Sequence, residues 1–326
     1  MNRKVSIRIR IEDAGRTVLA FLSQRFTYHD KNRWKALIGA GNVLLNGVPP
    51  LPDAPLNPRD ILTYEGFDET EPPVELAYEI LHEDEVLLVI DKPGNLPCHP
   101  GGRYFKHTLW HLLTTRYDAA PLYFVNRIDR ETSGIVLVAK TPSAARDCGR
   151  QFASGSVQKR YWVAVLGDFP SGPVCAEGGL CRDETSPVHK KQRFLPFQEA
   201  SRHSHPLKMC RTDFQLLNKN GGLSLLSAVP STGRLHQIRA TLFSLGYPVV
   251  GDKIYGPDDT LFLRFIEDRL TAEDRNRLVL PRQALHSESI ALRHPDGGCV
   301  TRWSSPLPAD MAGLFQGRCG PNRIIS

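Results

Sequence analysis

The sequence contains no long hydrophobic run. Its longest apolar stretches, such as Val86–Ile90 and Ile135–Ala139, are about five residues long, whereas a membrane-spanning helix needs about twenty. No apolar segment follows the basic residues near the N-terminus, so a secretory signal is not expected. These absences exclude a protein held by membrane-spanning helices, and they predict a cytoplasmic protein with no membrane partner.

The sequence also lacks metal and nucleotide motifs. Its seven cysteines include no C-x-x-C pair, which is typical of a reduced cytoplasmic protein whose cysteines pack as small core residues. A structural zinc site on these cysteines is the alternative. His107 and His111 stand four residues apart, but no H-E-x-x-H motif accompanies them. Since a glycine-rich phosphate loop is absent too, we expect no metal site and no cofactor.

A strong excess of either charge sign is absent as well. The 326 residues include 41 Lys and Arg against 35 Asp and Glu, a net charge of +6. This surplus permits a nucleic-acid partner without demonstrating one. With 41% hydrophobic and 23% charged residues, the chain has an ordinary globular composition and a length typical of two domains. No surplus amphipathic surface stands out, so we expect a monomer.

Charge and prolines divide the chain. Residues 1–65 carry ten Lys and Arg against six Asp and Glu. Four acidic residues with no basic residue among them then surround Pro72 and Pro73, at positions 68, 69, 71 and 75. Adjacent prolines within a like-charged run are typical of a linker. We therefore predict a small domain over 1–65, a linker over 66–76 and a larger domain over 77–326.

The first 65 residues predict two short helices followed by two strands. Helical spacing of apolar residues indicates the helices, with members at Val18, Phe21, Leu22 and Phe26 and then at Trp34, Leu37 and Ile38. Asn46-Gly47 predicts a tight turn between strands. Basic side chains on or beside the helices form either a solvated face or a binding surface; they are Arg25, Lys31, Arg33 and Lys35.

The larger segment predicts an α+β domain. Buried strands are expected at Val86–Ile90 and Ile135–Ala139, and a helix is expected between Thr141, as N-cap with Pro142 after it, and Gly155. Strands and helices alternate irregularly with many turns. This order favours an α+β architecture over a doubly wound parallel sheet.

The most informative segment is Asn126–Gly134, which reads N-R-I-D-R-E-T-S-G. Asp129 has Arg127 and Arg130 close in sequence, and a nearby cation lowers the pKa of a carboxyl. A carboxylate kept ionised in this way suits a nucleophile better than a general acid. The alternative is an Asp–Arg pair that supports a turn.

Two further segments carry polar residues at element starts. Lys159-Arg160-Tyr161 opens a predicted strand, where Tyr161 is either a half-buried strand residue, a stacking platform for a base or a weak acid–base group. Residues 233–239 read G-R-L-H-Q-I-R, and we expect Arg234 in the first turn of a helix. The helix dipole disfavours a cation there, so this arginine implies a carboxylate or phosphate partner.

Together the three segments resemble the RluA-type RNA pseudouridine synthases. The family motif H-R-L-D-x-x-T-S-G is matched at 126–134, K-x-Y at 159–161 and G-R-x-H-Q-[IL]-R at 233–239. The similarity covers about two thirds of the chain, 78–294, and departs from the motif at Asn126 and Ile128. Residues 256–280 add a charged and helical insertion. The first 65 residues resemble the small α-L RNA-binding module named after a ribosomal protein.

This resemblance implies a fold and a reaction. The fold is a large mixed, mainly antiparallel sheet, and the reaction is the isomerisation of uridine to pseudouridine in structured RNA, ribosomal or transfer, without a cofactor. Asp129 is implied as the essential carboxylate, which either attacks the sugar or removes a sugar proton, and Arg234 as its ion partner. Tyr161 is implied to stack on the uracil, Arg127 to fill the gap left by the extruded base, and Leu285 to line the uracil pocket.

RNA contacts are expected at two places. Residues 182–211 read as a basic loop between strands, which is either solvated surface or a phosphate-binding segment through Lys190, Lys191 and Arg193. Arg33 and Lys35 are the candidates in the small domain. Two rival functions remain: an inactive RNA-binding protein, and a glycoside hydrolase, which needs a second carboxylate that only Glu131 could supply.

Overall fold

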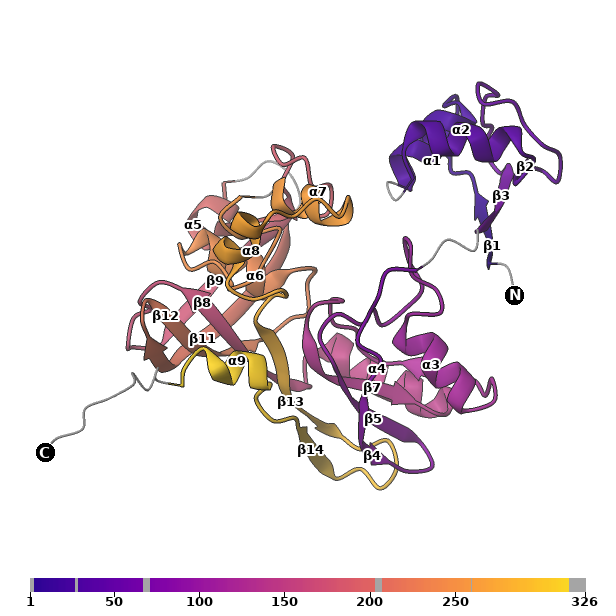
Figure 1. Cartoon of the computed structure of the whole chain (residues 1–326). Coiled ribbons are helices and arrows are strands. Elements are labelled where there is room, and N and C mark those ends of the chain that lie inside the picture. Colours follow the sequence, from indigo (N-terminus) through magenta and orange to yellow (C-terminus); the bar gives the residue numbers. More distant parts are fainter. Residues whose placement is uncertain (1–2, 27–28, 67–70, 203–206, 259, 317–326) are drawn as a thin grey trace, which may run out of the picture. The chain divides into compact units, whose positions relative to one another are not determined.

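A computed structural model describes residues 3–26, 29–66, 71–202, 207–258 and 260–316. The chain forms two compact units (Figure 1), one of Met1–Val74 with His99–Leu113 and the other of Glu75–Cys98 with Thr114–Ser326. The first division falls within the stretch 66–76 that prolines and acidic residues marked, whose residues 67–70 lie outside the described part. Nothing in the sequence pattern indicated that His99–Leu113 joins the first unit.

The predicted linker contains a residue that is bound within the first unit. The carboxylate of Glu71 accepts hydrogen bonds from the backbone N–H groups of Phe105, Lys106 and His107 at 2.8–2.9 Å. These bonds lower the pKa of the carboxyl, although burial acts against them. Glu71 therefore anchors one segment of this unit to another, and the acidic run is more than a solvated connection.

The first unit is built on a three-stranded antiparallel sheet of order β1-β3-β2. Its elements are β1 (Arg3–Arg8), the short 3-10 turn Ile11–Asp13, α1 (Val18–Arg25), α2 (Lys31–Gly39), β2 (Val43–Leu45) and β3 (Ile61–Gly66). Both helices begin at side-chain caps, Thr17 and Asp30. The two predicted helices, the Asn46-Gly47 turn and the last two strands are confirmed. Strand β1 was missed because its partner, β3, lies far along the chain.

The second unit contains an eleven-stranded sheet of order β10-β9-β11-β12-β8-β13-β7-β5-β4, with β14 paired to β13 and β6 to β7. Among the strands that the structure describes, only β13 and β7 pair in parallel, so the predicted α+β fold with a mainly antiparallel sheet is confirmed. The strands are β4 (Glu79–Glu83), β5 (Leu87–Lys92), β6 (Tyr123–Phe124), β7 (Ser133–Ala139), β8 (Gln158–Leu166), β9 (Val174–Arg182), β10 (Gln192–Pro196), β11 (Lys208–Asn220), β12 (Leu223–Pro230), β13 (Leu285–Arg293) and β14 (Val300–Ser304).

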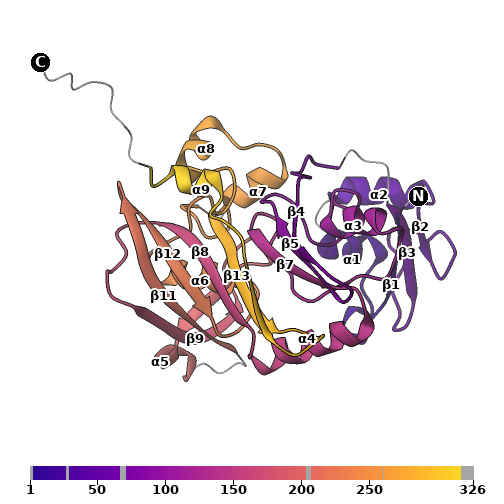
Figure 2. The ribbon, with the colours of Figure 1, turned by 90° about the horizontal axis from the view of Figure 1, so that it is seen from below.

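Helices lie beside this sheet (Figure 2). Two hydrophobic cores are buried in this unit, one around Val163, Leu226 and Leu242 and the other around Leu87, Leu137 and Cys148. The helices that lie wholly in this unit are α4 (Pro142–Ser154), α5 (Phe197–Ala200), α6 (Gln237–Ser244), α7 (Thr260–Ile266), α8 (Ala272–Leu278) and α9 (Ala309–Gly313). Helix α3 (Leu109–Arg116) spans the division between the two units.

Local signals placed some of these helices correctly. Helix α4 starts after Thr141, whose hydroxyl accepts the Ala144 N–H, and ends at Gly155 with a φ of 74°, as predicted. The insertion 256–280 contains α7 and α8, so its helical character is confirmed. The prediction of a loop over 182–211 is wrong for the residues that are described, because this segment contains β10, which pairs with β9 at the edge of the sheet, and helix α5. Residues 203–206 lie outside the described part of the chain.

A close approach of two strands positions the functional loop. Ser133 pairs with His286 and Gly134 with Ser287 where β7 and β13 run in parallel. Gly134 has a φ of +105°, and a Cβ atom there would stand 2.3 Å from the Ser287 carbonyl oxygen. Only glycine fits this position. The loop 126–132 is thereby held next to the segment that leads into β13.

Candidate active site

Asp129 lies on the loop between β6 and β7 and is held by a buried arginine. Its Oδ2 accepts a hydrogen bond from Arg239 Nη1 at 2.7 Å, and Gln283 Nε2 lies 3.4 Å away. The side chain keeps 33% of its exposure, whereas that of Arg239 keeps 5%. One carboxylate oxygen is therefore tied to the protein while part of the group stays accessible.

Arg239 is itself fixed by a second carboxylate. It donates from Nε and Nη2 to the two oxygens of Asp252, at 2.6 and 2.9 Å. Asp252 is fully buried, and its Oδ1 also accepts the N–H groups of Ile254 and Tyr255. A two-pronged contact of this kind fixes the plane of the guanidinium group. The chain Asp129–Arg239–Asp252 thus presents the outer carboxylate in one orientation.

The prediction that Arg234 pairs with Asp129 is wrong. Arg234 is exposed, and its Nε lies 3.5 Å from the Met209 carbonyl oxygen. It also precedes the helix, because α6 begins only at Gln237 after His236 in the left-handed region at φ 55°. The motif 233–239 does supply the partner, through its last residue. A charged residue among the buried Ile238, Ala240 and Leu242 was the signal for it, since a buried charge needs a partner.

The electrostatics of this cluster favour an ionised Asp129. Burial by itself raises the pKa of the carboxyl, but the Arg239 charge and the hydrogen bonds from Gln283 and Arg239 bring it well below the usual range. Burial and the Arg239 charge lower the pKa of His236, so this imidazole is neutral. Its Nδ1 lies 2.9 Å from the Tyr255 hydroxyl and its Nε2 lies 4.0 Å from Asp129 Oδ2.

Tyr161 comes from the neighbouring strand β8, where it pairs with Ala228 of β12 and Ser287 of β13. Burial raises its pKa to about 12, the nearby Ser287 side chain acts against this rise, and the Asp129 charge adds to it. Ser287 in turn pairs with Gly134 of β7, which directly follows the Asp129 loop, so strand pairing brings Tyr161 to the part of the sheet where that loop ends. The structure thus brings together two of the three residues that were predicted as catalytic.

A buried lysine donates a hydrogen bond to the backbone of the Asp129 loop. Lys92 is 0% exposed, and its Nζ donates to the carbonyl oxygens of Pro93 at 2.7 Å and Arg130 at 3.2 Å. Burial lowers its pKa to about 8. The Leu96 N–H donates to the same Arg130 oxygen. The segment that begins with Lys92-Pro93-Gly94 therefore fixes the backbone next to Asp129, a role that the sequence did not indicate.

Glu131, two residues after Asp129, is fully engaged by cations. Both of its carboxylate oxygens lie 2.9 Å from Lys253 Nζ, and Arg130 Nη2 donates to one of them at 2.8 Å. Phe265 of α7 covers both cations, at 4.6 Å from Lys253 and 4.8 Å from Arg130. A glycosidase acid must have a proton to give to the leaving group, and a carboxylate whose two oxygens contact cations is not placed to donate one. Glu131 in this setting argues against the glycoside hydrolase alternative.

Asn126, the departure from the family motif, has a structural partner. Its amide oxygen accepts the Leu137 N–H at 2.7 Å, and its Nδ2 donates to the Ile135 carbonyl at 3.3 Å. Both are backbone groups of β7. The side-chain amide of Asn126 therefore bonds to β7 as the backbone of a neighbouring strand would, and it fixes the start of the loop. Arg127, the next residue, is exposed.

The predicted RNA-contacting lysines divide into two kinds. Lys190 and Arg193 are exposed residues, and Lys190 Nζ lies 4.2 Å above the Phe262 ring of α7. Lys191 is buried, 5.1 Å from the Phe243 ring and 3.9 Å from Asp183. Lys191 directly precedes β10, and its burial argues against the phosphate contact that the sequence suggested for it.

The remaining predicted residues occupy the positions that their patterns suggest. Arg33 and Lys35 are exposed on α2, opposite the buried Trp34. Leu285 is 5% exposed and belongs to the hydrophobic core against which Tyr161 packs. The structure leaves the roles of these residues in RNA binding and uracil binding as predictions.

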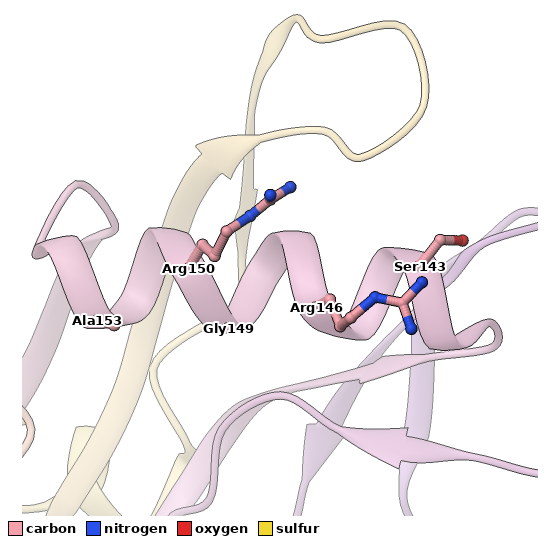
Figure 3. A pocket seen from close by; sticks show the side chains of 5 residues that line it. All are labelled: Ser143, Arg146, Gly149, Arg150 and Ala153. Atoms are coloured by element: carbon pink, nitrogen blue, oxygen red, sulfur yellow. The ribbon is translucent and has the colours of Figure 1, made fainter.

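A shallow hollow of about 610 Å³ lies on the outer face of α4. Figure 3 shows Arg146, Arg150 and Ser143 projecting there, with Gly149 and Ala153 as the other lining residues. No carboxylate or nucleophilic group other than the Ser143 hydroxyl lines it. The hollow contains none of the chemical groups of the Asp129 cluster.

In the part of the chain that the structure describes, no helix combines the length and the hydrophobicity that a membrane span requires.

Comparisons with known proteins agree with this geometry. Residues 86–244 match the family described as RNA pseudouridylate synthase. The ribosomal large subunit pseudouridine synthase D of Nitrosomonas europaea is 36% identical over 254 residues, which cover 76% of this chain and 67% of that protein. The mitochondrial tRNA pseudouridine(32) synthase of Saccharomyces cerevisiae is 31% identical over 243 residues, 73% of this chain and 50% of that protein.

The fold has a solved counterpart as well. The structure of human RNA pseudouridylate synthase domain containing 1 matches with a TM-score of 0.56 at 23% identity, over 73% of this chain and 86% of that one. At this identity the match establishes the shared fold. With the sequence similarity added, the chain that carries the Asp129–Arg239 pair belongs to the RluA-type RNA pseudouridine synthase family.

Proposed function

We propose that this protein converts specific uridines of a structured RNA, ribosomal or transfer, into pseudouridine, with Asp129 as the essential carboxylate. The observation that carries the proposal is the state of Asp129. It is held ionised and oriented by Arg239, it keeps a third of its exposure, and the strand pairing of Tyr161 with Ser287 and of Ser287 with Gly134 brings Tyr161 to the end of its loop. An inactive RNA-binding protein would have no need of a charge pair built on the fully buried Asp252.

The reaction balances without a co-reactant. The bond between sugar C1′ and uracil N1 breaks, the base turns, and a bond from C1′ to uracil C5 forms; C5 then loses a proton and N1 gains one. Nothing is oxidised or reduced. Asp129 serves either by attack on the sugar or by removal of a sugar proton, and an ionised carboxylate suits both roles.

Tyr161 is proposed as the surface on which the detached uracil turns. A pKa of about 12 keeps its hydroxyl protonated at neutral pH. This state favours ring stacking over a role as general base. Tyr161→Phe should then retain most of the turnover, whereas a role in proton transfer would cost about 10²–10⁴-fold in rate.

Base extrusion costs a few kcal/mol, which contacts with the RNA must offset. We assign these contacts to Arg127 on the Asp129 loop and to Lys190 and Arg193 of the second unit. Arg33 and Lys35 would serve the first unit as an RNA-binding module.

The described cysteines form no disulfide, which supports a reducing cytoplasmic location, and we propose a monomer.

Pseudouridine mapping of total RNA tests the function. Cells without the gene should lack one or a few modified sites in ribosomal or transfer RNA. A plasmid carrying the wild-type gene should restore them, and Asp129→Asn should leave them absent although the protein is present at a normal level. Unchanged maps in all three strains, combined with no product from purified protein on the same RNAs, would contradict the proposal.

A further inference from the structure

Three metal-binding side chains converge at one edge of the second unit. His82 lies in β4, Asp84 follows that strand, and His294 follows β13. Asp84 Oδ2 lies 2.9 Å from His82 Nε2 and 3.0 Å from His294 Nε2. The three ligand atoms all lie within 4.8 Å of one another. More than two hundred residues separate His82 from His294, so sequence spacing could not have indicated this group.

The carboxylate in the group is fixed by the backbone. Asp84 Oδ1 accepts the N–H groups of Val86 at 2.8 Å and Leu87 at 2.7 Å. The Asp84 carbonyl oxygen accepts Lys140 Nζ at 2.7 Å. Oδ2 is therefore the oxygen left to face the two imidazoles. Hydrogen bonds that orient a carboxylate in this way are typical of the surroundings of metal ligands.

His294 presents a buried nitrogen to the same point. Its Nδ1 lies 2.7 Å from the Asp296 carbonyl oxygen and 3.2 Å from the Asp296 nitrogen. The shorter contact fits an Nδ1–H donated to the carbonyl, which leaves a lone pair on Nε2. Within the described part of the chain, this buried Nε2 has no hydrogen-bond partner, although Asp84 is close to it. A lone pair that faces a carboxylate calls for a cation.

We propose that His82, Asp84 and His294 bind a zinc ion, with water in the fourth position. Zinc takes imidazole nitrogen and carboxylate oxygen at about 2.0–2.2 Å in a tetrahedron, so its ligand atoms stand about 3.3–3.5 Å apart. The two nitrogen–oxygen distances are a few tenths of an ångström shorter than this. A small outward movement of the side chains therefore admits the ion.

The ion would join β4, the last strand in the strand order, to the turn between β13 and β14. Strand β4 stands last in the strand order, and β14 pairs with β13. In the described part of the chain β4 does not pair directly with β13 or β14, because β5 and β7 stand between β4 and β13, and the zinc would add a direct connection. Trp303 of β14 lies against both imidazoles, with ring centroids 5.7 Å from His82 and 6.2 Å from His294. The proposal concerns stability and is independent of the RNA reaction.

The first test uses the full chain, stripped of metal and kept reduced, with zinc alone as the titrant. Calorimetry should give one ion per chain, and zinc should raise the melting temperature. Co²⁺ should bind at the same stoichiometry, show the visible absorption of a tetrahedral site and quench the fluorescence of Trp303. Trp303→Phe should remove that quenching and keep the binding. These measurements on the wild-type chain hold even if a ligand variant folds poorly.

Variants then assign the ligands. His82→Gln and His294→Gln should each lower the zinc affinity about tenfold or more. Cys299→Ser removes the thiol of the turn between β13 and β14 and His111→Gln a histidine elsewhere, and both should keep the wild-type affinity. A wild-type chain that binds no zinc, binding that survives in the double histidine variant, or binding that disappears in Cys299→Ser would overturn the proposal. The first of these outcomes would identify the group as a proton-linked His–Asp–His cluster.

Discussion

Asp129 and Glu131 lie two residues apart on one loop, yet their surroundings differ in kind. Asp129 has one short ion contact, to Arg239, and a side chain that is 33% exposed. Glu131 is 13% exposed and receives Lys253 on both oxygens and Arg130 on one. Asp129 is oriented and stays accessible, whereas the carboxylate of Glu131 is occupied by the ion contacts that hold the loop. Acidity and position in the sequence do not distinguish them; their partners do.

Neutralising each carboxylate in turn should give the largest difference between the two residues, because one variant should lose turnover and the other stability. Asp129→Asn should lower turnover by about 10²–10⁴-fold and leave RNA affinity near the wild-type value, because the shape is kept and the charge is removed. Glu131→Gln should keep turnover within about tenfold and destabilise the fold by about 1–3 kcal/mol, because Lys253 loses its charged partner. Single-turnover rates and RNA binding measure the first effect, and denaturant unfolding measures the second. Equal losses of turnover in the two variants would remove the distinction.

Removing the cations should separate the two carboxylates in stability. Arg239→Met leaves the fully buried Asp252 without its partner, at a cost of about 3–5 kcal/mol in the free energy of unfolding. Lys253→Met should cost less, about 1–3 kcal/mol, because Glu131 keeps Arg130. Urea unfolding compares the two variants. A larger loss for Lys253→Met would show that the Arg239 network contributes less to stability than its burial implies.

The pH dependence of stability should come from buried histidine and not from Asp129. Burial lowers the pKa of His286 to about 4 from an ordinary value of about 6.5. The folded state therefore binds fewer protons than the unfolded state between these values, and stability falls as pH drops from about 6.5 to 4, by about 3 kcal/mol from this group. His286→Gln should flatten the curve in this window. The depressed pKa of Asp129 supplies stability that persists to below pH 4 and is lost only in stronger acid.

The smallest expected effect concerns the basic residues near the loop. Lys190→Ala with Arg193→Ala should weaken RNA binding and reduce the slope of log affinity against log salt by about 1 for each phosphate that is no longer neutralised. Lys191→Ala is the matched control, because this lysine is buried against Phe243 and should not alter the slope. A filter-binding series over salt concentration measures all three variants. An unchanged slope in the double variant would place the phosphates elsewhere.

The Asp129 loop could be located from the sequence, whereas one of its partners could not. Asp129 was identified because its motif is contiguous, and α4 because Thr141 and Gly155 act within one turn of the helix. Arg234 was selected over Arg239 because the expected helix started three residues too early. Lys92 and Asp252 were not selected as functional, since their importance depends on burial beside Asp129 and Arg239. Burial of a polar side chain follows from packing and cannot be read from spacing.

The sequence by itself determined the features that depend on neighbours along the chain. These are the helix caps, the Asn46-Gly47 turn, the helices of the insertion and the motifs that mark the family. Tertiary structure alone decided which arginine meets Asp129, which lysine of the pair 190–191 faces solvent, and that His82 and Asp84 meet His294. Hydrogen bonds within a turn are determined by a few neighbouring residues. Contacts between residues far apart in the sequence depend on strand order and register, which are determined by the whole sheet.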